Sequence, residues 1–296
     1  GIWVAISMIG VSSIGMILFT SRPVGDAMAT TIWGASSSWT LTALPLFVWM
    51  GEILFRTKLS ENLFEGLAPW LQKLPGGLIH VNVVGCALFA AISGSSAATV
   101  ATVGKMSIPE LRKRKYPEKI LLGSLAGSGT LGLLIPPSII LIIYGVTVQE
   151  SIAKLFIAGI IPGIMIALIF MGYVIIWSLL NKNKMPLTEE NYSFLNKLSK
   201  SKQLIPVILL ILGVIGSIYT GIATATEAAS LGVVGALILS YFQKSLNLKT
   251  FKESLLGATK TSCMIAFILA GATFLSLAMG FTGLPRNLAI WIQNME

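Results

Sequence analysis

Long apolar runs alternate with short charged loops along the chain, a pattern that predicts membrane-spanning helices. The runs are each roughly 20 residues long and lack the strict alternation of a membrane β-strand. We expect spans over residues 2–19, 29–54, 120–148, 152–180 (interrupted at Pro162 and Gly163), 204–219, 226–242 and 261–281. The predicted fold class is an all-α polytopic membrane protein.

Two further apolar segments, residues 78–92 and 97–106, are too short to cross a membrane. As helices they span about 15 to 24 Å, less than the roughly 30 Å hydrocarbon core. The small polar tip between them consists of Ser93, Gly94, Ser95 and Ser96. Such a tip predicts a re-entrant hairpin, because irregular backbone at membrane depth must be buried in protein or line a watery cavity. Taken alone, the tip is equally compatible with a small-residue face for helix packing.

A second irregular stretch lies inside the apolar run at residues 120–148. Pro136 and Pro137 each lack an N–H and clash with the preceding turn, so the helix must break near Ile135. A hairpin tip together with a broken helix indicates a secondary transporter, because unwound carbonyls coordinate cations and half-helix N-termini face anions.

The tip and the break predict a binding site made of backbone and hydroxyl oxygens. We expect Na⁺ to be bound by Ser93, Gly94, Ser95, Ser96, Ile135, Pro136, Pro137 and Ser138. An anionic substrate is expected at the helix N-termini near Ser96, Thr99 and Ser138, because the arginines all lie near span ends. Na⁺ is the only metal we expect, without an organic cofactor or a catalytic residue.

Composition supports the membrane interpretation. Hydrophobic residues make up 54% of the chain and charged residues 11%, with a mean hydropathy of +0.83, which is too apolar for a soluble domain of this length. The net charge of +9 reflects lysines and arginines in loops, as the positive-inside rule expects, rather than a nucleic-acid surface. Both ends of the hairpin and the loop at residues 181–202 are therefore predicted to be cytoplasmic.

Three ionisable residues have both a structural and a functional interpretation. Glu227 follows Thr224 and Thr226, a pattern typical of a helix start, although a functional carboxylate is the alternative. We expect Glu52 to pair with a nearby cation and His80 to be a satisfied interfacial histidine rather than a proton relay.

An internal repeat is predicted from two amphipathic stretches. Residues 60–74 carry apolar side chains on one helical face and are expected to lie in the interface as an arm. Residues 287–292 resemble this arm, and each stretch follows a long span that contains a Phe and a Gly. We predict an inverted-topology repeat whose second hairpin would need roughly 120 further residues beyond Glu296.

This organisation divides the chain into four parts. We expect scaffold spans and the arm in residues 1–74, and the transport-domain hairpin with the broken helix in residues 75–148. Residues 149–222 hold a span, the basic loop and a linking span, and residues 223–296 begin the second repeat with its own arm.

The chain resembles the large membrane subunit of tripartite ATP-independent periplasmic (TRAP) transporters. The motifs that carry the resemblance are PLF at 45–47 with Gly51, SGSSAA at 93–98, LLIPPS at 133–138, FIAGIIPG at 156–163 and GIATATEAAS at 221–230. Together they follow one another through nearly the whole chain. Ala225 replaces a proline that is common in the family.

The resemblance implies a Na⁺-driven importer of organic anions, usually carboxylates such as C4-dicarboxylates or sialic acid, in the bacterial inner membrane. It also implies a periplasmic substrate-binding protein, a small membrane subunit and an elevator-type mechanism in which a transport domain slides against a scaffold.

Three other function classes share part of this pattern. A standalone Na⁺/carboxylate symporter shares hairpins and broken helices but needs no binding protein. A channel is less compatible with broken helices in inverted repeats. An intramembrane hydrolase with Ser93 as nucleophile and His80 as base is disfavoured, because 13 residues of helix separate them by about 20 Å.

Overall fold

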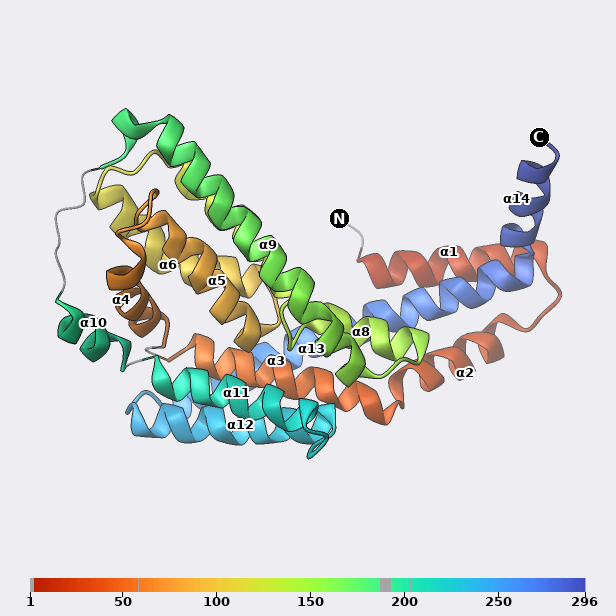
Figure 1. Cartoon of the computed structure of the whole chain (residues 1–296). Coiled ribbons are helices and arrows are strands. Elements are labelled where there is room, and N and C mark those ends of the chain that lie inside the picture. Colours follow the sequence, from red (N-terminus) through yellow and green to blue (C-terminus); the bar gives the residue numbers. More distant parts are fainter. Residues whose placement is uncertain (1–2, 58, 187–192, 203, 296) are drawn as a thin grey trace. The chain divides into compact units, whose positions relative to one another are not determined.

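The computed structural model describes residues 3–57, 59–186, 193–202 and 204–295, without the side chains of residues 59–62. Every regular element in these ranges is a helix, which confirms the predicted fold class (Figure 1). The α-helices are α1 (Val4–Phe19), α2 (Val24–Ser36), α3 (Ala43–Phe55), α4 (Leu59–Leu71), α5 (Ile79–Ser93), α6 (Ser96–Lys113), α7 (Glu118–Gly129), α8 (Ile139–Val148), α9 (Ile152–Leu180), α10 (Phe194–Ser201), α11 (Ile205–Tyr219), α12 (Ala225–Phe242), α13 (Leu248–Thr282) and α14 (Leu284–Gln293). Short 3-10 helices are η1 (Trp39–Thr42), η2 (Thr130–Leu133) and η3 (Lys182–Lys184).

The chain forms two compact units. The first consists of Gly1–Leu41 with Thr259–Glu296, and the second of Thr42–Ala258. In the first unit, Met16 packs with Phe274 and Ala278 in a small buried cluster. The second unit contains both the hairpin and the break.

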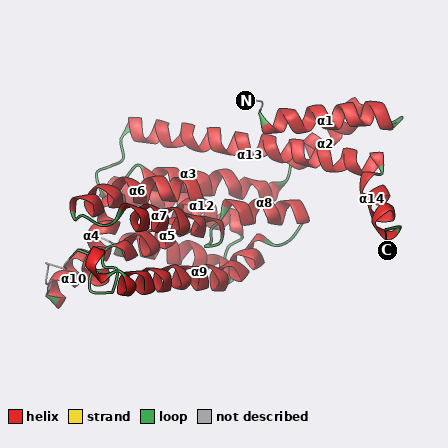
Figure 2. Ribbon diagram, turned by 90° about the horizontal axis from the view of Figure 1, so that it is seen from above, coloured by secondary structure: helices red, strands yellow, loops and turns green. Residues whose placement is uncertain are grey.

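Within the second unit, α5 is the central helix. It packs against α6, α7, η2, α3, α4 and α9, and α12 covers α3 (Figure 2). Val83 and Ala90 of α5 form a buried cluster with Leu131 of η2. This apolar packing fixes the hairpin against the region of the break.

The long apolar helices agree with a polytopic membrane protein. In the described ranges, α9, α12 and α13 are each long and apolar enough to cross a membrane, and counting two bent helix pairs as single spans gives up to five. Helix α5 has only 15 residues. At 1.5 Å per residue it covers roughly 22 Å, so the predicted hairpin helix is indeed shorter than the hydrocarbon core.

Two predicted spans differ from the structure. The predicted span at residues 29–54 is two helices, α2 and α3. The gap between them contains Ser37 and Ser38, and serine is disfavoured in helix interiors. Pro45 lies in the first turn of α3, where its missing N–H leaves no helical bond unmade. The predicted interruption at Pro162 is also wrong, since α9 continues through it. Neighbouring helices can satisfy the freed backbone group in such a span.

The basic segments are more helical than the loops that we predicted. Helix α13 begins at Leu248 rather than near residue 261, because Asn247 caps it: its Oδ1 accepts a hydrogen bond from Thr250 N at 2.7 Å. The loop at residues 181–202 contains η3 and α10, while its residues 187–192 lie outside the described ranges.

The start of α12 confirms the capping interpretation of Glu227. Thr224 Oγ1 accepts a hydrogen bond from Glu227 N at 3.3 Å, and Glu227 Oε2 accepts one from Thr224 N at 2.8 Å. The two residues form a capping box that satisfies two helix-end donors.

Replacing Thr224 with valine is expected to lower the free energy of unfolding by about 1 kcal/mol, because valine keeps the shape but has no cap acceptor. Thr224→Ser is the matched control and should stay close to wild type. Thermal unfolding of the purified subunit in detergent measures both. Equal midpoints for the valine and serine variants would contradict a stabilising capping box.

Candidate functional site

The predicted hairpin turns sharply between α5 and α6. Helix α5 ends at Ser93, and Gly94 adopts a left-handed conformation with φ of 60°. Ser95 is the N-cap of α6, where its Oγ accepts a hydrogen bond from Ala98 N at 3.4 Å. The N-terminus of α6, with its partial positive charge, therefore begins at the tip.

The predicted break separates α7 from α8. Helix α7 ends at Gly129, η2 follows, and the Pro136–Pro137 peptide is cis. Ser138 precedes the first turn of α8 and donates its hydroxyl to Leu133 O at 2.8 Å. The N-terminus of α8 thus begins at the end of the break.

The tip and the break contact each other directly. Ile139 N donates a hydrogen bond to Gly94 O at 3.1 Å. A Cβ on Gly94 would lie 2.7 Å from Pro137 O, and one on Gly132 would lie 2.9 Å from Ser96 N. The structure therefore brings the two predicted loops together, with the helix starts of α6 and α8 beside each other.

Oxygen atoms are concentrated behind the tip. Ser93 Oγ lies 2.9 Å from Thr99 Oγ1, and both Ser93 and Thr99 are buried. Thr99 Oγ1 donates to Ser95 O at 2.8 Å, and Ser93 Oγ donates to the same carbonyl at 3.3 Å. The buried Ser96 Oγ has no hydrogen-bond partner among the described residues. Neutral carbonyl and hydroxyl oxygens are the kind of ligand that a hard alkali cation takes.

The predicted site residues are not equivalent in their surroundings. Gly94 touches Pro137 and Ile139, with Ser138 between them in the sequence. The Ile135 side chain instead packs toward α9, where a Cβ on Gly163 would lie 2.8 Å from its Cγ1. Of the predicted residues, Ser93 to Ser96, Pro137 and Ser138 thus lie where tip and break meet.

Sequence reasoning identified Gly51 and Gly159 only as positions in motifs and missed that these glycines make room for this junction. A Cβ on Gly51 of α3 would lie 2.9 Å from Ser93 Cα, and one on Gly159 of α9 would lie 2.5 Å from Leu134 O. A glycine within a run of large apolar residues was the available signal, because a glycine inside a helix costs roughly 1 kcal/mol relative to alanine and needs a packing reason.

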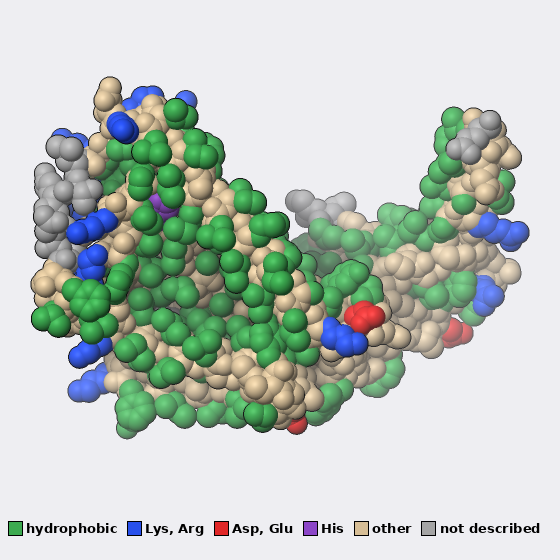
Figure 3. Space-filling model, viewed as in Figure 1, with side chains coloured by type: hydrophobic (Ala, Val, Ile, Leu, Met, Phe, Trp, Pro, Cys, Tyr) green, Lys and Arg blue, Asp and Glu red, His purple; other side chains and the backbone are tan. Residues whose placement is uncertain are grey.

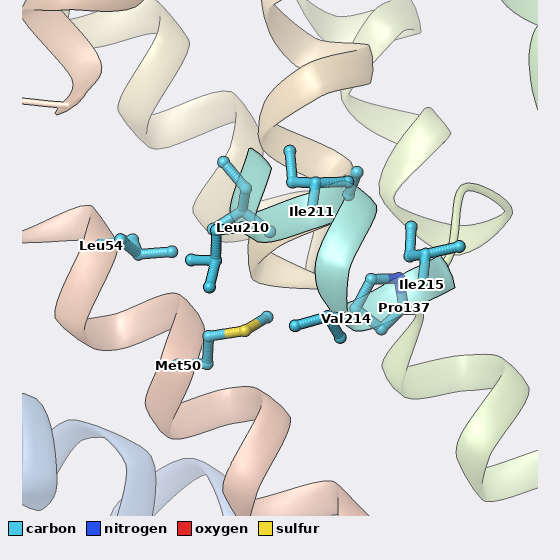
Figure 4. A pocket seen from close by; sticks show the side chains of 9 residues that line it. Met50, Leu54, Pro137, Leu210, Ile211, Val214 and Ile215 are labelled. Carbon is cyan, nitrogen blue, oxygen red and sulfur yellow. The ribbon is translucent and has the colours of Figure 1, made fainter. Parts of the chain in front are cut away.

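The surface of Pro137 that faces α3 and α11 is apolar. The crevice beside Pro137, some of whose lining side chains are labelled in Figure 4, has no room for a water molecule. It is lined by Met50, Leu54, Ala91, Ile92, Pro137, Leu210, Ile211, Val214 and Ile215. A cation would therefore find oxygen ligands at the hairpin tip and none in this apolar crevice.

The ionisable residues lie away from the tip. Glu52 pairs with Arg56 at 3.1 Å, which confirms the predicted ion pair, and Arg56 also pairs with Glu253 at 3.1 Å. His80 is fully buried near the start of α5, where its Nε2 lies 2.8 Å from Pro75 O. Its Nδ1 has no hydrogen-bond partner among the described residues. The prediction of a fully hydrogen-bonded histidine therefore holds for Nε2 only.

A wide polar cavity of about 800 Å³ opens beside the second half of α6. Arg56 and Glu253 lie on its wall, together with Thr102, Lys105 and Glu110 of α6. Thr99 and Thr102 lie three residues apart on α6, so one face of this helix runs from the tip toward the cavity.

The chain was compared with known proteins. It matches the family described as "Tripartite ATP-independent periplasmic transporter, DctM component" over residues 1–296. It is 32% identical over 288 residues to the C4-dicarboxylate TRAP transporter large permease protein DctM of Pseudomonas aeruginosa, covering 97% of this chain and 67% of that protein.

The names of two further relatives give other substrates. The sialic acid TRAP transporter large permease protein SiaM of Vibrio cholerae is 32% identical over 292 residues, 98% of this chain and 67% of that protein. The isethionate TRAP transporter permease protein DctMQ of Oleidesulfovibrio alaskensis is also 32% identical, over 98% of this chain and 45% of its own length. The chain thus spans about two thirds of the length of the two large permease relatives and less than half of the length of the isethionate permease protein.

Proposed function

Because the chain belongs to the DctM component family of tripartite ATP-independent periplasmic transporters, we propose that it forms part of the path by which an organic anion enters the cell with Na⁺. Members of this family are transport subunits of the inner membrane, not enzymes. For this chain we propose the coupling to Na⁺, the anionic substrate and the partner proteins.

The contact between tip and break is the observation that carries the proposal. The hydrogen bond from Ile139 N to Gly94 O joins the two loops. Beside it, Ser93 Oγ, Ser95 O and Ser96 Oγ supply uncharged oxygens within one turn of chain. Such converging oxygens, without a carboxylate, suit Na⁺ better than a divalent metal, and the described residues contain no acidic or histidine cluster that could hold a metal ion.

The anionic substrate is proposed to bind beside this cation. The names of the relatives include a C4-dicarboxylate, sialic acid and isethionate, all organic anions. The N-termini of α6 and α8 offer free N–H groups and positive dipole ends to an acidic group. Of the three predicted substrate residues, Thr99 and Ser138 already donate their hydroxyls to carbonyls, so Ser96 is the best placed to donate to a ligand.

The partners follow the tripartite organisation of the family. We propose that a periplasmic protein delivers the substrate and that a small membrane subunit packs against this chain. An elevator movement, in which hairpin and broken helix move together, is supported by the direct contacts between these two elements.

Uptake into proteoliposomes tests this function. The full-length subunit and its small partner are reconstituted, and uptake of a labelled dicarboxylate, sialic acid or isethionate is followed with and without the candidate binding protein. Uptake that needs both a Na⁺ gradient and the binding protein supports the tripartite function. Na⁺-driven uptake without that protein supports the standalone symporter instead.

Replacing both Ser93 and Ser95 with alanine is expected to raise the Na⁺ concentration for half-maximal uptake about tenfold. Loss of the Ser93 hydroxyl removes a proposed cation ligand and the hydrogen-bond partner of Thr99 Oγ1. Loss of the Ser95 hydroxyl removes the cap acceptor of Ala98 N, which helps to position the Ser95 carbonyl. Each unpaired group costs about 1–3 kcal/mol. Uptake measured over a series of Na⁺ concentrations gives this value.

The matched control is Ser230→Ala, because Ser230 is an exposed serine whose hydroxyl bonds only Thr226 O of its own helix. This control should keep the wild-type Na⁺ dependence. An unchanged Na⁺ dependence in the double variant would sink the proposed cation site.

A further inference from the structure

Helix α10 has an apolar side that is largely exposed within the described residues. Phe194, Leu195 and Leu198 are 67%, 74% and 49% exposed. At 100° per residue, these three side chains fall within one third of the helix circumference. Asn196 and Lys200 lie on the opposite side, so the helix is amphipathic despite its short length.

Helix α4 fixes the orientation of α10. Trp70 Nε1 donates a hydrogen bond to Ser201 Oγ at 2.7 Å, and the Trp70 ring meets the Phe194 ring edge-on at 6.2 Å. Lys197 Nζ lies 5.3 Å from the centre of the Trp70 ring. These contacts hold the side of α10 that carries Phe194, Lys197 and Ser201 against α4. Leu195, about 100° around the helix from Phe194, points away from Trp70.

Helix α10 and the residues described on either side of it carry only positive charge. Residues 193–202 contain Lys197, Lys200 and Lys202 and no acidic residue, and the exposed Lys73 follows α4. Glu65 of α4 lines the polar cavity instead. Lysine and arginine side chains gather at the end of the second unit that carries α4 and α10 (Figure 3).

We propose that α4 and α10 together form a binding surface for anionic phospholipids of the bilayer. Leu195 and Leu198 enter the boundary between headgroups and acyl chains, Trp70 lies at headgroup level, and the lysines bind lipid phosphates. An apolar helix side flanked by lysines and a tryptophan is the combination that binds an anionic bilayer surface. This inference rests on the membrane location of the chain and not on Na⁺ coupling.

A fluorescent label on α10 tests the proposal in the full-length subunit with its small partner. Cys86 and Cys263 are replaced by alanine, and Leu195→Cys carries an environment-sensitive label. Asn196→Cys is the matched control, one residue along and about 100° around the helix. Both are reconstituted in phosphatidylcholine alone or mixed with phosphatidylglycerol, with spin-labelled lipids as quenchers.

The Leu195 label is expected to be quenched by the spin-labelled lipids, more strongly in the bilayer that contains phosphatidylglycerol, while the Asn196 label stays unquenched. Lys197→Gln with Lys202→Gln should abolish the difference between the two bilayers, and Lys197→Arg with Lys202→Arg should keep it. High salt should weaken the quenching in the same direction.

Two results would overturn the proposal. A Leu195 label that stays unquenched in both bilayers means that water or protein covers the apolar side. Equal quenching in both bilayers means that the surface does not prefer anionic lipids. Uptake assays need not change in either case, so this test and the test of the proposed function fail independently.

Discussion

Gly94→Ala is expected to reduce Na⁺-driven uptake by about tenfold or more, because two separate costs fall on the same residue. An L-residue pays about 1–2 kcal/mol in the left-handed conformation that Gly94 adopts, with φ of 60°. The added Cβ would also lie 2.7 Å from Pro137 O and 3.2 Å from Ile139 N, both backbone atoms that no side-chain rotation can move away. The hydrogen bond from Ile139 N to Gly94 O should therefore be lost, and with it the junction of tip and break.

Gly221→Ala separates these two costs. Gly221 also has a positive φ, of 72°, but an added Cβ would meet no atom within 4 Å. This variant should lose a similar amount of stability to backbone strain while uptake per folded molecule stays close to wild type. Uptake assays normalised to folded protein, with thermal unfolding alongside, measure both variants. If the two glycine variants lose uptake equally, backbone strain alone explains the loss and the junction has no special role.

Gly51→Ala should also reduce uptake about tenfold, although it lies on a different helix from the proposed ligands. An added Cβ would lie 2.9 Å from Ser93 Cα and 3.3 Å from both Ile92 O and Ser93 O. Overpacking of this kind costs typically 1–3 kcal/mol. Because the affected atoms belong to the hairpin tip, the Na⁺ concentration for half-maximal uptake should rise as well.

The control for Gly51 is Gly216→Ala in α11, another helical glycine, where an added Cβ would meet no atom within 4 Å. Alanine favours a helix over glycine by roughly 0.5–1 kcal/mol, so this variant should be slightly more stable and transport normally. Thermal unfolding and Na⁺ titrations of uptake are compared for both variants. A Gly51→Ala protein that transports with unchanged Na⁺ dependence contradicts the role assigned to this contact.

The hairpin and the break could be predicted from the sequence because their signals are local. Pro136 and Pro137 cannot continue a helix, and the tip at Ser93–Gly94–Ser95 interrupts two apolar segments that are too short to span. That the two loops touch was a hypothesis from their chemistry, which the hydrogen bond between Ile139 N and Gly94 O confirms. Their roles in binding Na⁺ and substrate remain predictions.

The sequence predictions that were wrong depended on tertiary packing or on local residues with competing preferences. Pro162 predicts an interruption, but α9 packs against the break there and continues. The serines at 36–38 look compatible with an apolar span, yet α2 ends at Ser36. The contacts of Gly51 and Gly159 with the tip and break depend on which helices become neighbours, which composition and periodicity do not specify.

The junction of tip and break is embedded in a segment without formal charge. From residue 81 to 104 and from residue 120 to 149, the chain contains no Asp, Glu, Lys, Arg or His. An applied voltage acts on each moving elementary charge with about 2.3 kcal/mol per 100 mV. Under the proposed elevator movement, voltage would therefore act on the bound ions and substrate rather than on this part of the carrier. The current per transported anion, together with the charge of that anion, would then report the number of Na⁺ ions that accompany it, and these two segments would add no voltage dependence to the return of the empty site.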